Sequence, residues 1–186
     1  MKITMHVEEV ALLSSVMKGS DSYFEFGMGG STYLAAGLVK NIIHAVDTSQ
    51  DWVDKVSAAM DAQDKEVSLR RVDVGPTGEW GFPISRLNEA NFPSYSLAIL
   101  ESGVSYDLCL VDGRFRVACF LQAVKSLRSD SVIAFHDYSV RPEYHLVENF
   151  ARPIATNRTL TLFVRRADCD FTNLDATLTK YRLNWA

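Results

Sequence analysis

Short apolar runs alternate along the chain with longer segments whose apolar residues recur every three or four positions. The runs have the length and composition of strands, whereas the longer segments have helical spacing. Strands that alternate with helices in this way form a mostly parallel sheet with helices on both faces, a doubly wound α/β fold. Strands are predicted at 23–26, 41–46, 67–74, 106–112, 131–135 and 159–164.

The segments of helical spacing carry start and stop signals. Gly19 follows the first of them, Ser49 is placed to cap the third, and Pro142 stands at the first turn of a later one. The last helix, turn and strand before residue 165 suit an antiparallel edge of the sheet. Helices are predicted at 8–18, 33–39, 49–63, 95–102, 117–127, 143–150 and 174–181.

The segment 75–93 contains too many glycines and prolines for a regular element. Loops of this length in a compact domain are usually functional or disordered, and the large side chains of Trp80 and Phe82 favour order. The loop leaves the carboxyl end of the third predicted strand, the side on which ligands of such sheets bind. Trp80 or Phe82 is therefore expected to cover a pocket, or else to anchor the loop.

Length and composition limit the organisation of the chain. Its 186 residues suffice for one buried core and are few for two. A single domain is predicted, with a helical cap at 1–20, a Rossmann-like core at 21–165 and a carboxyl-terminal extension at 166–186.

Charge and cysteine content exclude several classes of function. A net charge of −4 and the lack of a basic block disfavour a nucleic-acid partner. No secretory signal and no run of about 18 apolar residues is visible, so no membrane association is expected and the location is predicted to be cytoplasmic. Cys109 and Cys119 lie in apolar segments and are interpreted as small buried hydrophobic residues.

The first predicted strand runs directly into a glycine-rich turn that opens a helix. Gly27, Gly29 and Gly30 allow unusual backbone angles and leave room for a ligand beside the helix start. Ser31 or Thr32 is placed to cap that helix. A strand, a glycine turn and a helix in this order are typical of nucleoside-binding βαβ units.

Two acids refine this prediction. Asp47 ends the second predicted strand, where a carboxylate can accept hydrogen bonds from two ribose hydroxyls. Glu25 precedes the first glycine, where it would repel a pyrophosphate but pair with a cationic group. The dinucleotide fingerprint also needs glycine where this chain has Thr32, so a nicotinamide-dependent oxidoreductase is disfavoured.

The pattern E-F-G-x-G-x-S-T with Asp47 after the next strand resembles the class I S-adenosylmethionine-dependent methyltransferases. The resemblance covers residues 23–164 and implies a seven-stranded sheet with a reversed final strand. It also implies that the glycine turn holds the methionine part of the cofactor and Asp47 the ribose, and we expect Asp73 or the backbone after it to contact the adenine. The expected cofactor contacts are Glu25, Gly27, Gly29, Ser31, Asp47 and Asp73.

Acids also follow the fourth and fifth predicted strands. Because these strands are neighbours in the implied order, Asp112 and Asp137 are expected to lie close together, with a proton or a cation between them. The surrounding motifs L-V-D-G and F-H-D-Y are similar to those of metal-dependent catechol-type O-methyltransferases, in which such acids bind magnesium. Tyr138 replaces the amide ligand of that family, and His136 is added. Asp112 and Asp137 are therefore candidate metal ligands, but in a site whose other ligands differ from those of that family.

Without a metal, His136 is the predicted general base, because its ordinary pKa near 6.5 suits proton removal at neutral pH. Asp112 or Asp137 would then orient the imidazole ring; alternatively, His136 is a hydrogen-bonded residue of the rim. Arg114, Arg116, Arg141 and Tyr144 follow the same two strand ends. Arg114, Arg141 and Tyr144 are the candidates for recognising an anionic acceptor.

The sequence thus predicts an S-adenosylmethionine-dependent methyltransferase for a small-molecule acceptor, with transfer to oxygen favoured. A cofactor-binding protein of the same fold without turnover is the alternative, and a nicotinamide-dependent oxidoreductase a weaker one. Met28 and Trp52 are interpreted as packing residues. The apolar segment 183–186 packs on the body of the protein or on a second copy, so a homodimer stays open.

Overall fold

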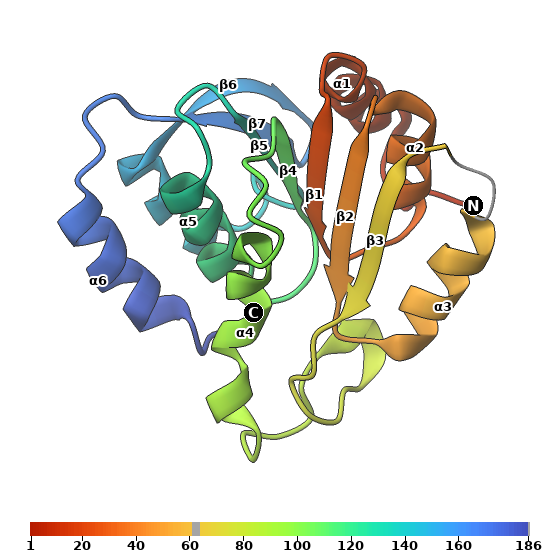
Figure 1. Cartoon of the computed structure of the whole chain (residues 1–186). Helices are drawn as coiled ribbons and strands as arrows, with labels where there is room; N and C mark the ends of the chain where they lie inside the picture. The colour runs from red at the N-terminus through yellow and green to blue at the C-terminus, as the bar shows by residue number, and fades with distance from the viewer. Residues whose placement is uncertain (61–63, 186) are drawn as a thin grey trace.

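A computed structural model describes residues 1–60 and 64–185 of the chain and places its strands in one seven-stranded sheet (Figure 1). The strand order is β3-β2-β1-β4-β5-β7-β6. All neighbouring strands from β3 to β5 pair in parallel, β7 runs antiparallel to β5, and β6 pairs antiparallel with β7. The strands are β1 Ser22–Phe26, β2 Ile42–Asp47, β3 Glu66–Arg71, β4 Leu108–Val111, β5 Val132–Phe135, β6 Ala151–Asn157 and β7 Leu160–Arg165.

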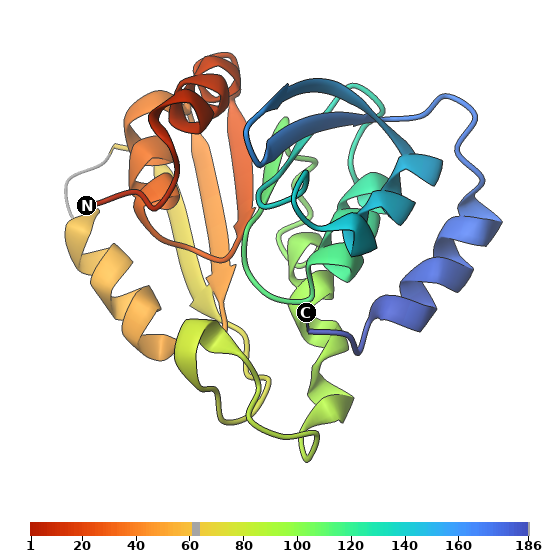
Figure 2. The same cartoon turned by 180° about the vertical axis from the view of Figure 1, so that it is seen from behind.

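Helices cover both faces of the sheet. On one face α1 packs beside α2 and α2 beside α3, and on the other α5 lies between α4 and α6 (Figures 1 and 2). The α-helices are α1 Val7–Met17, α2 Gly30–Leu38, α3 Gln50–Ala59, α4 Pro93–Leu97, α5 Arg116–Ser126 and α6 Phe171–Tyr181, and the 3-10 helices are η1 Glu79–Gly81, η2 Glu89–Asn91, η3 Ala98–Leu100 and η4 Pro142–Asn149.

The core is divided by the sheet into two layers of buried side chains. Successive residues of a strand point to opposite faces, so Tyr23 joins the layer under α1, α2 and α3, whereas Phe24 and Phe26 join the aromatic layer under α5. Phe120 and Phe135 stack with ring centroids 5.2 Å apart in that second layer. The central strands are buried on both faces, as parallel strands between helices are.

The predicted fold class is confirmed, with two differences in detail. β3 ends at Arg71, three residues before the predicted end. β6 was not predicted, because it is a mostly exposed edge strand with Pro153 in its middle and a register shift between Pro153 and Ala155. The reversed strand β7 therefore lies one position inside the edge.

Most predicted helices are present with shifted ends. The helix expected at 95–102 forms as α4 followed by η3, and the one expected at 143–150 is the 3-10 helix η4. α3 begins after its cap at Ser49, and the predicted end of this helix at Gln63 lies outside the described residues. Among the described residues, no helix combines the length and the apolar character needed to cross a bilayer.

Candidate active site

A cleft of about 420 Å³ lies at the carboxyl ends of β1, β2, β4 and β5. Its volume falls within the range of small-molecule sites, and its position is the one expected of an open α/β sheet. The lining residues are Lys2, Ile3, Thr4, Met5, Gly27, Met28, Gly29, Gly30, Ser31, Asp47, Trp52, Trp80, Phe82, Asp112, Gly113, Arg114, Arg116, His136, Asp137 and Arg141.

The glycine turn after β1 touches the turn after β4. Gly27 has a left-handed φ of 90°, and a Cβ on it would lie 2.4 Å from the Cα of Gly113. Neither turn can therefore carry a side chain at this contact. The backbone N–H of Gly27 donates to the carbonyl of Val46 at 2.8 Å, which joins the turn to the end of β2.

Glu25 lies beneath this turn and is fully buried. Its two carboxyl oxygens accept hydrogen bonds from the hydroxyls of Ser31 and Thr32, the latter at 2.6 Å. Burial raises the pKa of Glu25 to about 8, and the nearby charge of Asp112 adds to the shift, although the two hydroxyls oppose it. Glu25 does not line the cleft, so the structure places it as an internal support for the start of α2 rather than at the predicted cofactor contact.

Thr32 links the turn to this buried acid. Its hydroxyl accepts a hydrogen bond from the N–H of Gly29 at 2.8 Å while it donates to Glu25. The cap residue of α2 is therefore Gly29 rather than Ser31 or Thr32, and Thr32 instead bonds back to it from the first turn. Ser31 both lines the cleft and bonds Glu25.

Asp47 lies at the cleft where β2 ends, as predicted. Its carboxylate accepts hydrogen bonds from the N–H groups of Ser49 at 2.9 Å and Met28 at 3.2 Å. Burial raises the pKa of Asp47 to about 6, against the lowering effect of these donors and of Arg114. Asp47 therefore fixes the glycine turn and is at the same time the acid available to a polar ligand at this end.

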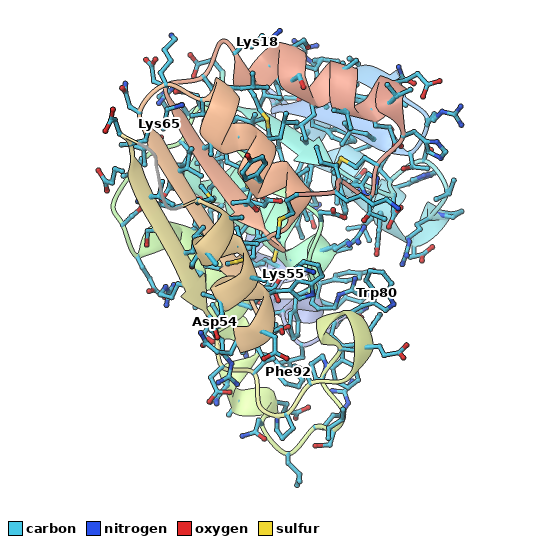
Figure 3. All side chains as sticks on the ribbon, turned by 90° about the vertical axis from the view of Figure 1, so that its right-hand side faces the viewer. Lys18, Asp54, Lys55, Lys65, Trp80 and Phe92 are labelled. Carbon is cyan, nitrogen blue, oxygen red and sulfur yellow. The ribbon has the colours of Figure 1, made fainter. Side chains whose placement is uncertain are left out.

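The long loop folds back over the end of β2. The hydroxyl of Thr48 donates to the carbonyl of Gly81 at 3.0 Å. This contact carries Trp80 and Phe82 to the cleft, with Trp80 72% exposed and labelled on the loop in Figure 3. Asp73 instead points away, because its carboxylate accepts from the Arg71 guanidinium and from the N–H of Gly75, so the predicted Asp73 contact has no support in the structure.

Arg116 connects the two acids at the other end of the cleft. Its guanidinium donates to Asp112 Oδ1 at 3.2 Å and to Asp137 Oδ2 at 3.0 Å. It also bonds the carbonyls of Asp112, Gly113 and His136 at 2.8 to 3.0 Å. The positive charge expected between the two acids is thus a nearly buried arginine side chain.

His136 lies between two carboxylates. Its Nδ1 is 2.9 Å from Asp112 Oδ1, and its Nε2 is 3.5 Å from Oε2 of Glu9, a buried residue of α1. Burial lowers the pKa of His136, but Asp112, Asp137 and Glu9 outweigh it and raise the pKa above its ordinary value. Both ring nitrogens are directed at acids, so His136 links β5 to α1, and its predicted role as general base stays a prediction.

The carboxylates of Asp112 and Asp137 each keep one oxygen turned away from Arg116. Oδ2 of Asp112 has no hydrogen bond to the described residues, and Oδ1 of Asp137 approaches only His136, at 3.7 Å. Asp137 also has a left-handed φ of 58°, which is uncommon for a residue other than glycine and is frequent at functional sites. These two oxygens can therefore accept a hydrogen bond or a proton from a ligand.

The donor set fits a divalent ion poorly. Asp112, His136 and Asp137 do present one potential ligand atom each within 4.8 Å of one another. However, Arg116 lies 5% exposed against both acids, so an added ion would face a fixed guanidinium charge. We derive no role for a metal from these residues.

The three predicted acceptor residues occupy different positions. Arg114 and Arg141 line the cleft, whereas Tyr144 is buried behind Arg141 and accepts its hydrogen bond at 3.3 Å. Phe115 separates Arg114 from Arg116 and has a left-handed φ of 54°. The side chains on either side of it therefore have different partners: Arg116 bonds the two acids, and the guanidinium carbon of Arg114 lies 4.0 Å from the centroid of the Phe82 ring.

The fold recurs in solved structures. A methyltransferase-like protein from Silicibacter pomeroyi is 31% identical in sequence, with 98% of this chain and 97% of that chain covered and a TM-score of 0.88. The chain belongs to this methyltransferase-like family. Its fold is that of the class I methyltransferases.

More distant solved structures share only the fold. The N-methyltransferase NodS from Bradyrhizobium japonicum in complex with S-adenosylhomocysteine is 13% identical, with 85% of each chain covered and a TM-score of 0.54. Precorrin 8w decarboxylase from Methanobacterium thermoautotrophicum is 17% identical, with 88% of each chain covered and a TM-score of 0.55. No protein-family model and no curated protein sequence matches the chain.

Several residues of this methyltransferase-like cleft were not predicted. Met28 and Trp52 line it rather than only packing inside the protein, and the segment from Lys2 to Met5 borders the glycine turn. Glu9 approaches His136 from a helix distant in sequence. The spacing of apolar residues in the first helix holds no signal for this contact, because only the packing of α1 beside the turn between β6 and β7 creates it.

Proposed function

We propose that this protein transfers a methyl group from S-adenosylmethionine to a hydroxyl of a small-molecule acceptor. The observation that carries the proposal is a single cleft with two distinct ends. One end has the glycine turn and Asp47, and the other has the open carboxylate oxygens of Asp112 and Asp137. Membership of the methyltransferase-like family supports the same activity.

The cofactor would lie at the glycine-turn end. A Cβ on Gly29 would meet no atom within 4 Å, so the backbone here borders open space that a ligand can fill. Asp47 is placed to accept hydrogen bonds from the two ribose hydroxyls, and its pKa near 6 leaves it mostly ionised at neutral pH. Trp80 supplies apolar surface for the adenine.

The acceptor would lie at the acid end. S-adenosylmethionine supplies an electrophilic methyl group on sulfur, and the protein has to hold an acceptor oxygen in line with it. Oδ1 of Asp137, or Oδ2 of Asp112, can accept a hydrogen bond from the acceptor hydroxyl and take its proton. Arg116 holds both carboxylates in position through its hydrogen bonds.

The first experiment is a calorimetric titration of S-adenosylhomocysteine into the wild-type protein and into Asp47→Asn. We expect binding to the wild type and a loss of about tenfold or more in the variant, because the ribose loses its charged partner. Asp51→Asn, an exposed residue in the first turn of α3, is the matched control and should bind as the wild type does. An absence of binding to the wild type would disprove the proposal.

Turnover separates a transferase from a protein that only binds the cofactor. Release of S-adenosylhomocysteine from S-adenosylmethionine, measured over a set of hydroxyl, amine and thiol acceptors, should be fastest with a hydroxyl acceptor and slower in Asp137→Asn. Tight binding with no release for any acceptor would favour the binding protein. A preference for amines would retain the transferase and reject transfer to oxygen.

A further inference from the structure

Two arginines near the end of β4 differ in the partners that the fold gives them. Arg116 donates hydrogen bonds to two carboxylates and three carbonyls. Arg114 is only 8% exposed, yet its Nε is buried without a hydrogen-bond partner among the described residues, and its guanidinium makes no ion pair with them. A buried cation without a partner is costly, so such a group marks a position where a ligand can supply the missing acceptor.

The surroundings of Arg114 leave one side open. The ring of Phe82 covers one face of the guanidinium, with 4.0 Å between the ring centroid and the guanidinium carbon. Burial, with the nearby charge of Arg116, lowers the pKa of Arg114, and the charge of Arg141 adds to this effect. Arg114 also lines the cleft, so a ligand in the cleft can contact its side chain.

The arginines that line the cleft differ in how far protein groups already bind them. Arg116 already donates hydrogen bonds to Asp112 and Asp137. Arg141 donates a hydrogen bond to the Tyr144 hydroxyl, and its guanidinium lies 3.6 Å from the Asp137 carboxylate. Asp47 forms no ion pair with Arg114. Its carboxylate accepts hydrogen bonds from backbone N–H groups instead. Among the described cations that line this cleft, Arg114 is thus the buried one without a hydrogen bond or ion pair, whereas Lys2 is exposed.

We propose that Arg114 binds a carboxylate of the methyl acceptor, so that the substrate is a small hydroxy acid. This proposal rests on the proposed function, since it names the substrate class of the same cleft. A guanidinium can bind a carboxylate in a bidentate manner, and the apolar ring of Phe82 strengthens the pair by excluding water. The carboxylate would anchor the acceptor at Arg114 while its hydroxyl meets Asp137.

A carboxylate could also come from the methionine part of the cofactor. Two ligands separate these sources, because S-adenosylhomocysteine carries that carboxylate and methylthioadenosine lacks it. If Arg114 serves the acceptor, Arg114→Gln should bind both ligands as the wild type does. A loss for S-adenosylhomocysteine alone would assign Arg114 to the cofactor carboxylate, a loss for both would assign it to the adenosine, and either result would overturn the proposal.

The direct test is a titration of meta-hydroxybenzoate and of its neutral amide, each with and without S-adenosylhomocysteine, followed by ligand-observed NMR. We expect the wild type to bind the carboxylate about tenfold or more tightly than the amide, Arg114→Gln to lose this preference and Arg114→Lys to keep part of it. Arg166→Gln, an exposed arginine paired with Asp168 outside the cleft, is the control and should keep the full preference.

The outcomes separate this proposal from the proposed function. Equal binding of the acid and the amide to the wild type, or a preference that survives in Arg114→Gln, would overturn the role of Arg114 while leaving cofactor binding intact. A carboxylate preference that depends on Arg114 in a protein that binds no S-adenosylhomocysteine would instead reject the methyltransferase and retain the carboxylate site. Circular dichroism of each variant confirms that a lost preference reflects the side chain rather than unfolding.

Discussion

The two ends of the cleft are built by different means, and two buried glutamates show the difference. Glu25, below the glycine turn, receives hydrogen bonds from hydroxyls only, and burial raises its pKa to about 8. Glu9, behind the acid end, is equally inaccessible, yet its pKa falls to about 2. Burial opposes that fall, but Thr159, the N–H of His6 and the charge of His136 outweigh it.

The comparison teaches that the glycine-turn end of the cleft is organised by backbone shape and the acid end by charge. At the glycine turn the decisive contacts are between backbone atoms of Gly27 and Gly113. At the acid end, Asp112, Asp137 and Glu9 are held by Arg116 and His136. Perturbations of charge should therefore act mainly on the second end, and perturbations of backbone space on the first.

Arg116→Met should have the largest effect on stability. Removing the guanidinium leaves two partly buried carboxylates facing each other, which we expect to cost about 4 kcal/mol in the free energy of unfolding. Urea unfolding at neutral pH measures this loss. Arg141→Met is the matched control, because Arg141 is more exposed and lies 3.6 Å from Asp137, and it should cost less than about 1 kcal/mol. Similar losses in both variants would contradict the role of Arg116 as the link between the acids.

Gly27→Ala should destabilise the other end by about 3 kcal/mol. The new Cβ would meet the backbone of Gly113 at 2.4 Å, and the left-handed φ of Gly27 adds strain. Gly37→Ala, inside α2 with no atom within 4 Å of its Cβ, should instead stabilise the protein by about 0.5 kcal/mol. Thermal and urea unfolding compare the two, and a tolerated Gly27→Ala would show that the contact between the turns can relax.

Glu9 should make stability depend on pH in the acid range. Its pKa is 4.5 ordinarily and about 2 in the folded protein, so its contribution is fully present above about pH 4.5 and is lost as the pH falls towards 2. We expect about 3 kcal/mol of the free energy of unfolding to disappear over this range in the wild type. Glu9→Gln should lack this part of the dependence, measured by urea unfolding at a series of pH values.

Glu25→Gln provides the contrast to Glu9. Because the pKa of Glu25 is raised in the folded protein, its ionisation lowers the free energy of unfolding as the pH rises from about 4.5 to 8. The effect of Glu9 falls in the acid range instead. The variant should therefore keep the loss of stability in acid and remove the loss towards pH 8. If Glu25→Gln changed the acid side instead, the two glutamates would not be independent.

Trp80→Ala should have the smallest effect on stability and a distinct effect on binding. The side chain is 72% exposed, so the free energy of unfolding should change by less than about 0.5 kcal/mol. Because Trp80 lines the cleft and is the residue proposed to cover the adenine, affinity for S-adenosylhomocysteine should fall by about tenfold, as loss of one aromatic contact implies. Leu87→Ala, in the same loop, 93% exposed and outside the cleft, should change neither quantity.

The sequence alone determined the order of elements, the fold class and the end of the sheet at which the site lies. Short apolar runs, glycine turns and helix caps are local signals, and parallel strands necessarily bring Gly27, Asp47, Asp112 and Asp137 to one edge. The edge strand β6 escaped prediction because exposure and Pro153 removed its apolar pattern.

Only the tertiary structure decided what each of these side chains does. Glu25 turns to Ser31 and Thr32 rather than to the cleft, Asp73 turns to Arg71, and Arg116 rather than Arg114 takes the two acids. Glu9 reaches His136 across most of the chain length. Hydrogen-bond partners of this kind depend on distances between elements and on burial, and neither quantity is encoded in the spacing of residues along one segment.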